Sequence, residues 1–210
     1  MACGPDVIFI GGWLAGSYDA LSQIAPVVYL ATDSDLGVVE SVRQNTRAIA
    51  SLFGLEDTAG ELMTGFDSRV AALASFSEAE PPLCGPGYQR RLQCAGQRRP
   101  LLPHRPGSGL CNVGADAQPG TSTHGNEASF EFLVDKDPDY LFVLDRDAAI
   151  GTDGAKLAQE VVENELMKGT AAYRDGRIVY LAHPAVWYTA EGGITALDRM
   201  LRDLEDPLLK

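Results

Sequence analysis

Two hydrophobic patterns alternate along most of this chain. Short, continuous apolar runs predict buried strands at 7–10, 27–30, 140–144 and 178–181. Apolar residues at helical spacing predict helices over 18–24, 38–53, 57–76, 154–168 and from 192 onward. Strands that alternate with helices of this length are typical of parallel sheets built from βα units. The pattern therefore predicts an α/β protein with one group of strands on each side of helix 57–76.

The predicted helix over 57–76 is long for a globular protein. Leu62, Phe66, Val70 and Leu73 form its apolar stripe, and Gly54 ends the helix before it. A helix of about 20 residues is suited to connecting two packed units.

Both patterns break down between Pro82 and Gly120. This stretch holds five arginines, no lysine, a single acidic residue, three of the four cysteines and half of the twelve prolines. It has almost no apolar periodicity, so we expect it to be the least ordered part of the chain.

Composition and charge exclude some classes of function. With 45% apolar and 22% charged residues, the 210 residues form one large domain or two small lobes of ordinary globular composition. The formal net charge of −12 argues against a nucleic-acid partner, because phosphate binding needs clustered lysine and arginine. No apolar run reaches the roughly 18 residues of a membrane span. No signal peptide is visible after Met1, so the chain as written predicts a cytoplasmic product.

Few residues carry recognisable chemistry. The cysteine spacings fit neither a zinc site nor a disulfide framework, and no nucleophile–base pair, P-loop or paired-carboxylate site is present. Arg146 follows the strongest predicted strand at its carboxyl end, where open α/β sheets place ligand residues. The alternative for Arg146 is a salt bridge with Asp145 or Asp147.

Several motifs nevertheless occur together in a fixed order. They are Pro5–Gly12, Tyr18–Pro26, Ser122–Asn126, Pro138–Arg146, and Val179–Leu181 followed by Trp187 and Tyr188. Together they resemble the substrate-binding proteins of ABC importers for iron–siderophore complexes, in the branch that binds ferric catecholates and petrobactin-type ligands. The resemblance covers everything except the 82–120 segment.

The resemblance implies a fold and partners. The fold would be α/β, with two Rossmann-like lobes bridged by a long helix, as in class III periplasmic binding proteins. The chain would comprise a partial N-terminal lobe (1–55), the bridging helix (56–78) and a C-terminal lobe (79–210). As the resemblance implies, we expect a periplasmic or membrane-anchored monomer without intrinsic cofactor or enzymatic activity. It would bind a ferric siderophore between the lobes and deliver it to ABC permease subunits.

The resemblance also implies site residues. Arg146 would contact catecholate oxygens, since guanidinium donates in a planar fork and keeps its charge. His124 and Tyr188 would fill iron positions left open by a siderophore with only four donor atoms; imidazole and phenolate both bind iron. Trp187 would be a cleft-wall or packing aromatic.

Two departures from the family pattern affect this site. Trp13 stands where the family usually has an arginine, and it could stack on an aromatic ligand instead. A second family arginine belongs to the 82–120 segment, where Arg105 cannot be assigned to it, so Arg146 is the one that remains.

Three alternatives stay open. A cytosolic α/β enzyme could bind a nucleotide cofactor at the Gly11–Gly12 turn, although the G-x-G-x-x-G spacing is absent. Within the binding class, the ligand could be cobalamin or haem. The chain could also be a non-functional fragment, because a missing strand of the second lobe would expose sheet edges.

The break at 82–120 suggests a frameshift in the gene, restored near Gly120. For a suitable choice of codons, dropping one base from those of Cys84–Arg91 gives Ala-Ala-Leu-Val-Ile-Asn-Ala-Gly, which reads as a buried strand. We predict that the gene sequence carries codons compatible with this shift; incompatible codons would refute the hypothesis.

Overall fold

The computed structural model describes residues 3–33, 36–79, 90–94, 110–112, 130–151, 158–189 and 192–209. Its elements, in chain order, are β1 (Ile8–Ile10), η1 (Gly12–Ser17), α1 (Tyr18–Ser22), β2 (Val27–Tyr29), α2 (Gly37–Phe53), α3 (Glu56–Ala79), β3 (Arg90–Cys94), β4 (Leu110–Asn112), α4 (Phe130–Lys136), β5 (Tyr140–Val143), α5 (Arg146–Ile150), α6 (Ala158–Val162), η2 (Met167–Gly169), α7 (Ala171–Arg174), β6 (Ile178–Tyr180), α8 (Pro184–Thr189) and α9 (Ile194–Leu208).

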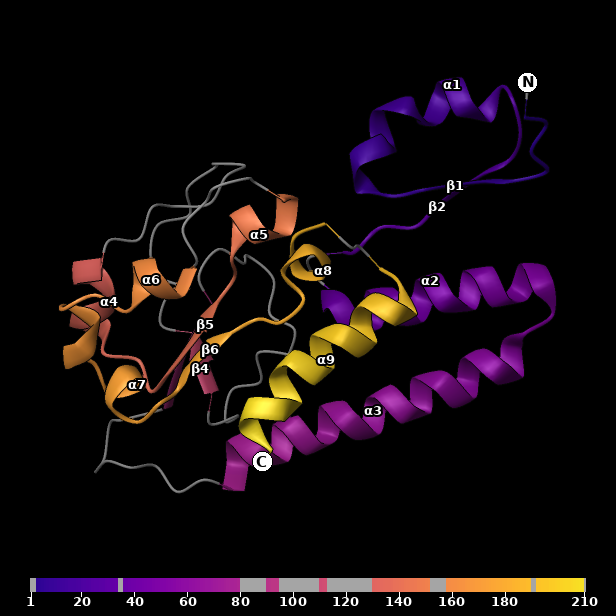
Figure 1. Cartoon of the computed structure of the whole chain (residues 1–210). Coiled ribbons are helices and arrows are strands. Elements are labelled where there is room, and N and C mark those ends of the chain that lie inside the picture. The colour runs from indigo at the N-terminus through magenta and orange to yellow at the C-terminus, as the bar shows by residue number, and fades with distance from the viewer. Residues whose placement is uncertain are drawn as a thin grey trace.

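The first unit is a small βαβ arrangement. β1 and β2 pair in parallel, with Ile8 opposite Val27 and Ile10 opposite Tyr29. η1 and α1 connect the two strands, as the short predicted helix between two apolar runs requires. Figure 1 shows this unit in indigo at one end of the molecule, beyond α2.

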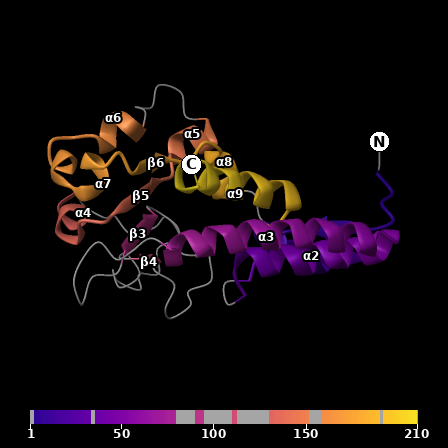
Figure 2. The same cartoon turned by 90° about the horizontal axis from the view of Figure 1, so that it is seen from below.

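Three helices form the middle of the molecule. α2 ends at Gly54, whose φ of 65° is the left-handed conformation predicted for its C-cap. The short turn that follows lets α3 pack antiparallel to α2, and α9 packs against both helices. In Figure 2, α2 and α3 run as a pair away from the four-stranded sheet. α3 has 24 residues, so the long predicted helix is confirmed.

The second sheet contains four parallel strands in the order β4-β3-β5-β6. All four residues of β5 are buried, as its continuous apolar run predicts for an inner strand. Successive side chains of a strand point to opposite faces. Tyr140 and Phe142 accordingly join the cluster that contains α3 and α9, whereas Leu141 and Val143 pack on Met167.

The 82–120 segment contributes to this sheet, contrary to the expectation of a missing strand. β3 and β4 both lie within the segment, and β3 pairs with β5 so that Leu92 lies opposite Tyr140. Sheet ladders are made by backbone groups, which polar sequences also supply. Apolar periodicity alone therefore missed both strands. The rest of the segment lies outside the described residues.

The predicted helix over 154–168 is wrong in its extent. α6 ends at Val162, and Asn164 Oδ1 then accepts hydrogen bonds from the backbone N–H groups of Leu166, at 3.0 Å, and Met167, at 3.2 Å. An asparagine side chain that bonds nearby backbone amides competes with the helix. As a result Met167 is buried and Leu166 is exposed.

The predicted apolar stripe of α3 is partly correct. Phe66 and Leu73 are buried and Val70 is partly buried in the central cluster. Leu62 is exposed, and Met63 takes the buried position instead. The reason is that α3 packs against both α2 and α9, so its buried face is set by two neighbours.

One buried amide joins distant parts of the chain. Asn45, on α2, donates from Nδ2 to the carbonyl oxygens of Ala31 at 3.3 Å and Gly192 at 3.4 Å. Ala31 follows β2 and Gly192 precedes α9. Gly192 has a φ of 74°, and an added Cβ would clash with the Asn45 amide nitrogen, so only glycine fits here.

We predict that Gly192→Ala lowers the free energy of unfolding by about 2–4 kcal/mol, from left-handed strain plus steric conflict with Asn45. Gly176→Ala is the matched control, because Gly176 has a φ of 65° but open space around its Cβ position. It should cost only about 1 kcal/mol. Urea denaturation measures both; equal losses would contradict the role of Asn45.

Candidate functional site

The candidate site lies where β5 and β6 end. These strands are parallel neighbours, so their carboxyl ends meet at one edge of the sheet. α5 follows β5, α8 follows β6, and the two short helices pack against each other. Figure 1 shows both helices on the side of the sheet that faces the first βαβ unit. In open α/β sheets this edge is where ligands bind.

Arg146 is the first residue of α5. The helix is capped by Asp145, whose Oδ1 accepts a hydrogen bond from the backbone N–H of Ala148 at 2.9 Å. Asp145 Oδ2 accepts a second bond from the N–H of Ala158 at 3.1 Å. Both carboxylate oxygens therefore bind main-chain amides, and Asp145 fixes the backbone that carries Arg146. For Arg146 itself the structure describes the backbone only.

α8 carries the two predicted aromatic residues, which differ in environment. Trp187 is 7% exposed, belongs to the central core cluster and donates from Nε1 to Asp203 Oδ2 at 2.8 Å. This placement favours the packing interpretation of Trp187 over the cleft-wall one. Tyr188 is 36% exposed. The tyrosine predicted to bind iron is thus partly exposed, and the tryptophan beside it packs in the core.

His183 and Asp203 form a pair that the sequence pattern did not predict. Asp203, on α9, accepts hydrogen bonds from the backbone N–H of His183 at 3.0 Å and from His183 Nδ1 at 2.7 Å. The signal for Asp203 is present in the sequence, since it follows Met200 at helical spacing and precedes Leu204. An acid on the inward face of a helix needs buried partners.

Tyr180, at the end of β6, is unsuited to binding iron. Its hydroxyl donates to Glu163 Oε1 at 3.2 Å. Burial, and then the neighbouring Glu163 carboxylate, raise the pKa of Tyr180 well above its ordinary value. A phenol that resists ionisation is a poor source of phenolate. Of the two tyrosines near this edge, Tyr188 is the better candidate.

No contact within the described residues places Trp13 or His124 at the carboxyl ends of β5 and β6. Trp13 lies in η1, directly after β1, and is 78% exposed. His124 lies outside the described residues. The structure therefore places Arg146 and Tyr188 on adjoining helices and leaves the contribution of His124 as a prediction.

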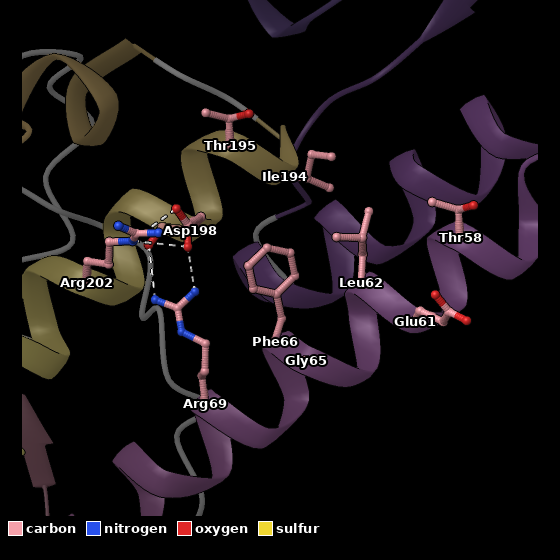
Figure 3. A pocket seen from close by; sticks show the side chains of 10 residues that line it. All are labelled: Thr58, Glu61, Leu62, Gly65, Phe66, Arg69, Ile194, Thr195, Asp198 and Arg202. Carbon is pink, nitrogen blue, oxygen red and sulfur yellow. Dashed lines mark hydrogen bonds and ion pairs between the residues drawn. The ribbon is translucent and has the colours of Figure 1, made fainter.

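A separate hollow of about 670 Å³ lies between α3 and α9. Figure 3 shows Arg69 at one end, pointing toward Asp198 and Arg202 of α9. Arg69 binds Glu205 through a fork of two 2.7 Å hydrogen bonds and Asp198 through a third of 2.7 Å. Because Nε and both terminal nitrogens already donate to α9, this guanidinium joins the helices rather than offering an anion site.

The charges in this hollow affect one another. The hydrogen bonds to Glu205, followed by those to Asp198, raise the pKa of Arg69. Burial alone would raise the pKa of Asp198, but hydrogen bonds from Arg69 and Arg202 outweigh it and hold that pKa below its ordinary value. The ionised forms of both partners are therefore stabilised in the folded state.

In the ranges that the structure covers, no three His, Cys, Asp or Glu side chains gather closely enough to hold a metal ion. No helix within those same ranges is long and apolar enough to cross a membrane.

The sequence pattern of the periplasmic binding protein family matches residues 1–80 and 109–185. The chain belongs to the periplasmic binding protein family. The family match stops where the predicted break begins, and it resumes at residue 109, before the predicted end of the break at Gly120. β4 consequently lies in the part of the chain that matches the family, whereas β3 does not.

Nearly the whole of this chain aligns with two curated relatives. It is 30% identical over 208 residues to the petrobactin-binding protein YclQ of Bacillus subtilis, covering 98% of the chain and 64% of the relative. It is 24% identical over 212 residues to the ferric-anguibactin-binding protein FatB of Vibrio anguillarum, covering 97% and 63%. The chain thus spans slightly less than two thirds of the length of these curated relatives.

A solved structure confirms the fold class. The periplasmic catecholate-siderophore binding protein VctP of Vibrio cholerae superimposes with a TM-score of 0.77 at 28% identity, covering 97% of this chain and 72% of that protein. The α/β fold of two lobes bridged by a long helix, expected from the resemblance, is therefore confirmed.

We predict that Arg69→Met lowers the free energy of unfolding by about 2 kcal/mol at pH 6, because Asp198 and Glu205 lose their partner while remaining half-buried. The folded-state pKa of Asp198 is depressed. Its stabilising contribution is therefore present above the ordinary value of 3.8 and is lost as pH falls through the lower folded value. The difference between the proteins should shrink at pH 3.

Urea denaturation at both pH values measures the effect. Arg174→Met is the control, because Arg174 is exposed on α7 and its replacement should change stability by less than about 0.5 kcal/mol. A pH-independent loss in Arg69→Met would show that packing, rather than charge, explains the effect.

Proposed function

We propose that this protein is the solute-binding component of an ABC importer and captures a ferric siderophore for iron uptake. The observation that carries the proposal is the pairing of α5 and α8 at the carboxyl edge of β5 and β6 in a chain of this family. Arg146 and Tyr188, the residues predicted to bind the siderophore, lie on these two helices. The names of YclQ, FatB and VctP describe siderophore-binding proteins and support the same cargo class.

Arg146 supplies the charge that this cargo needs. A ferric tris-catecholate complex is a trianion, and a guanidinium group can bind its oxygens in a planar fork while remaining ionised. Asp145 is the acid that precedes Arg146, and its two oxygens bind the amides of Ala148 and Ala158. Asp145 thus serves as the helix cap, and the binding measurement below distinguishes a ligand role for Arg146 from a local salt bridge with Asp145 or Asp147.

Tyr188 supplies a hard oxygen donor suited to Fe(III). His124 is proposed as the second iron contact, when the siderophore leaves positions open. Trp13 is proposed to stack on an aromatic ring of the cargo, and its high exposure is consistent with that role. Trp187 is proposed to support the site indirectly, because its packing in the core holds α8, the helix that carries Tyr188.

Delivery to an ABC permease, an extracytoplasmic location and a monomeric state belong to the same proposal. A nucleotide-dependent enzyme is less well supported, because the Gly11–Gly12 turn leads into η1, a 3-10 helix. Phosphate sites of dinucleotide-binding proteins use the N-terminus of an α-helix after a glycine-rich turn.

Tryptophan fluorescence tests the proposal, because the chain contains two tryptophans, Trp13 and Trp187. We predict that a ferric catecholate at micromolar concentration quenches this fluorescence in a saturable way. Arg146→Ala should weaken binding by about 30-fold or more, since truncating a charged partner costs about 2–5 kcal/mol. Tyr188→Phe should abolish any visible phenolate-to-iron charge-transfer band.

Arg174→Ala is the matched control for loss of positive charge, since Arg174 is exposed on α7, away from α5 and α8. It should bind like the wild type. A protein that responds only to NAD(P) or another nucleotide, and not to ferric siderophore, would refute the proposed function.

A further inference from the structure

A buried carboxylate on α9 holds the helix that carries Tyr188. The side chain of Asp203 is 2% exposed and accepts three hydrogen bonds. An ionised carboxylate can only accept hydrogen bonds. The donors to it are therefore the backbone N–H and Nδ1 of His183 and Nε1 of Trp187. Burying a carboxylate costs several kcal/mol unless such donors compensate for its lost hydration.

All three donors come from one short segment, at the start of α8. The backbone N–H and Nδ1 belong to His183, and Nε1 belongs to Trp187. The carbonyl oxygen of His183 in turn accepts bonds from the N–H groups of Val186, at 2.9 Å, and Trp187, at 3.3 Å. Asp203 therefore holds α8 at two points that are one helical turn apart on the same face.

Two points on one face fix both the position of a helix and its rotation about its own axis. Tyr188 is the residue after Trp187, about 100° further around the helix. With Trp187 held in the core, Tyr188 lies about a quarter of a turn from the anchored face and is partly exposed. Release of the anchor would allow α8 to rotate and would move the phenol.

We propose that Asp203 is a positioning residue for the cargo site, which sets the rotation of α8 so that Tyr188 is presented next to α5. This inference rests on the proposed function, because it assigns Asp203 a purpose in binding Fe(III) through Tyr188. Asp203 contacts His183 and Trp187 rather than the cargo, so its influence on iron is transmitted through α8.

Two substitutions separate the hydrogen bonds of Asp203 from its charge. Asp203→Leu keeps the branching at Cγ in a larger, apolar side chain that accepts no hydrogen bond, and it leaves the donors of His183 and Trp187 unsatisfied. Asp203→Asn removes the charge, yet its Oδ1 can still accept the bonds from the His183 N–H and the Trp187 indole. Asp198→Asn is the control on the same helix, because Asp198 pairs with Arg69 and Arg202 rather than with α8.

The affinity for a four-donor ferric catecholate and the phenolate-to-iron charge-transfer band are measured in each variant, together with stability in urea. Asp203→Leu should weaken binding by about 10- to 100-fold, the usual effect of losing a residue that orients a metal ligand, and should shift or remove the band. Asp203→Asn should retain most of the affinity and most of the charge-transfer band. Asp198→Asn should lose stability without change in the band.

A double variant tests whether Asp203 acts through Tyr188. In the Tyr188→Phe background, Asp203→Leu should cause little further loss of affinity, because the group that it positions is already absent. A full additional loss would overturn the proposed connection. If Asp203→Leu does not fold, His183→Ala removes the 2.7 Å bond and should produce a smaller loss in the same direction; unchanged affinity would then overturn the proposal.

The two proposals fail in different ways. Absence of ferric siderophore binding by the wild-type protein would refute the proposed function, and the inference with it. Normal binding by the wild type together with an unchanged affinity and band in Asp203→Leu would refute only the role of Asp203.

Discussion

The packing of α9 is the interaction on which most of this structure depends. Its apolar face is buried against α2, α3 and α8, with Leu197 and Leu201 fully enclosed. Two acids on the same helix extend these contacts: Asp198 pairs with Arg69 of α3, and Asp203 holds α8. One helix therefore connects the long α2–α3 pair to the edge of the sheet where cargo binding is proposed. Apolar burial supplies most of the free energy that holds α9 in place. The polar groups Asp198 and Asp203 set the positions of the neighbouring helices α3 and α8.

The sequence predicted the elements whose signal is carried by apolar residues. β5 follows from its run of four buried residues, and α2 from its periodic stripe and the C-cap at Gly54. It did not predict α5 or α8, because their five and six residues show no periodic apolar stripe. β3 was missed because its pairing uses the backbone, and its side chains follow no apolar pattern.

The candidate site was predictable to a different degree for each residue. Arg146 could be located because it follows the strongest strand, and Tyr188 because of its motif. Helical spacing places Asp203 on the inward face of α9, but it does not reveal the backbone amides that Asp203 and Asn164 bind. Buried polar side chains were thus the main source of error in the prediction from sequence. The hydrogen bonds of one asparagine or aspartate can end a helix or fix its position even where the apolar pattern predicts otherwise.

The fork between Arg69 and Glu205 joins residues that are 136 positions apart. Contacts between such distant positions close a large loop of chain, so they form late during folding. Until α9 arrives, the inward faces of α2 and α3, including Met63 and Phe66, have no cover from it. During synthesis α2 and α3 are made well before α9, so in that interval their inward faces are available to other apolar surfaces. The order in which the chain is made therefore matters for these faces, because their cover is supplied by the last helix.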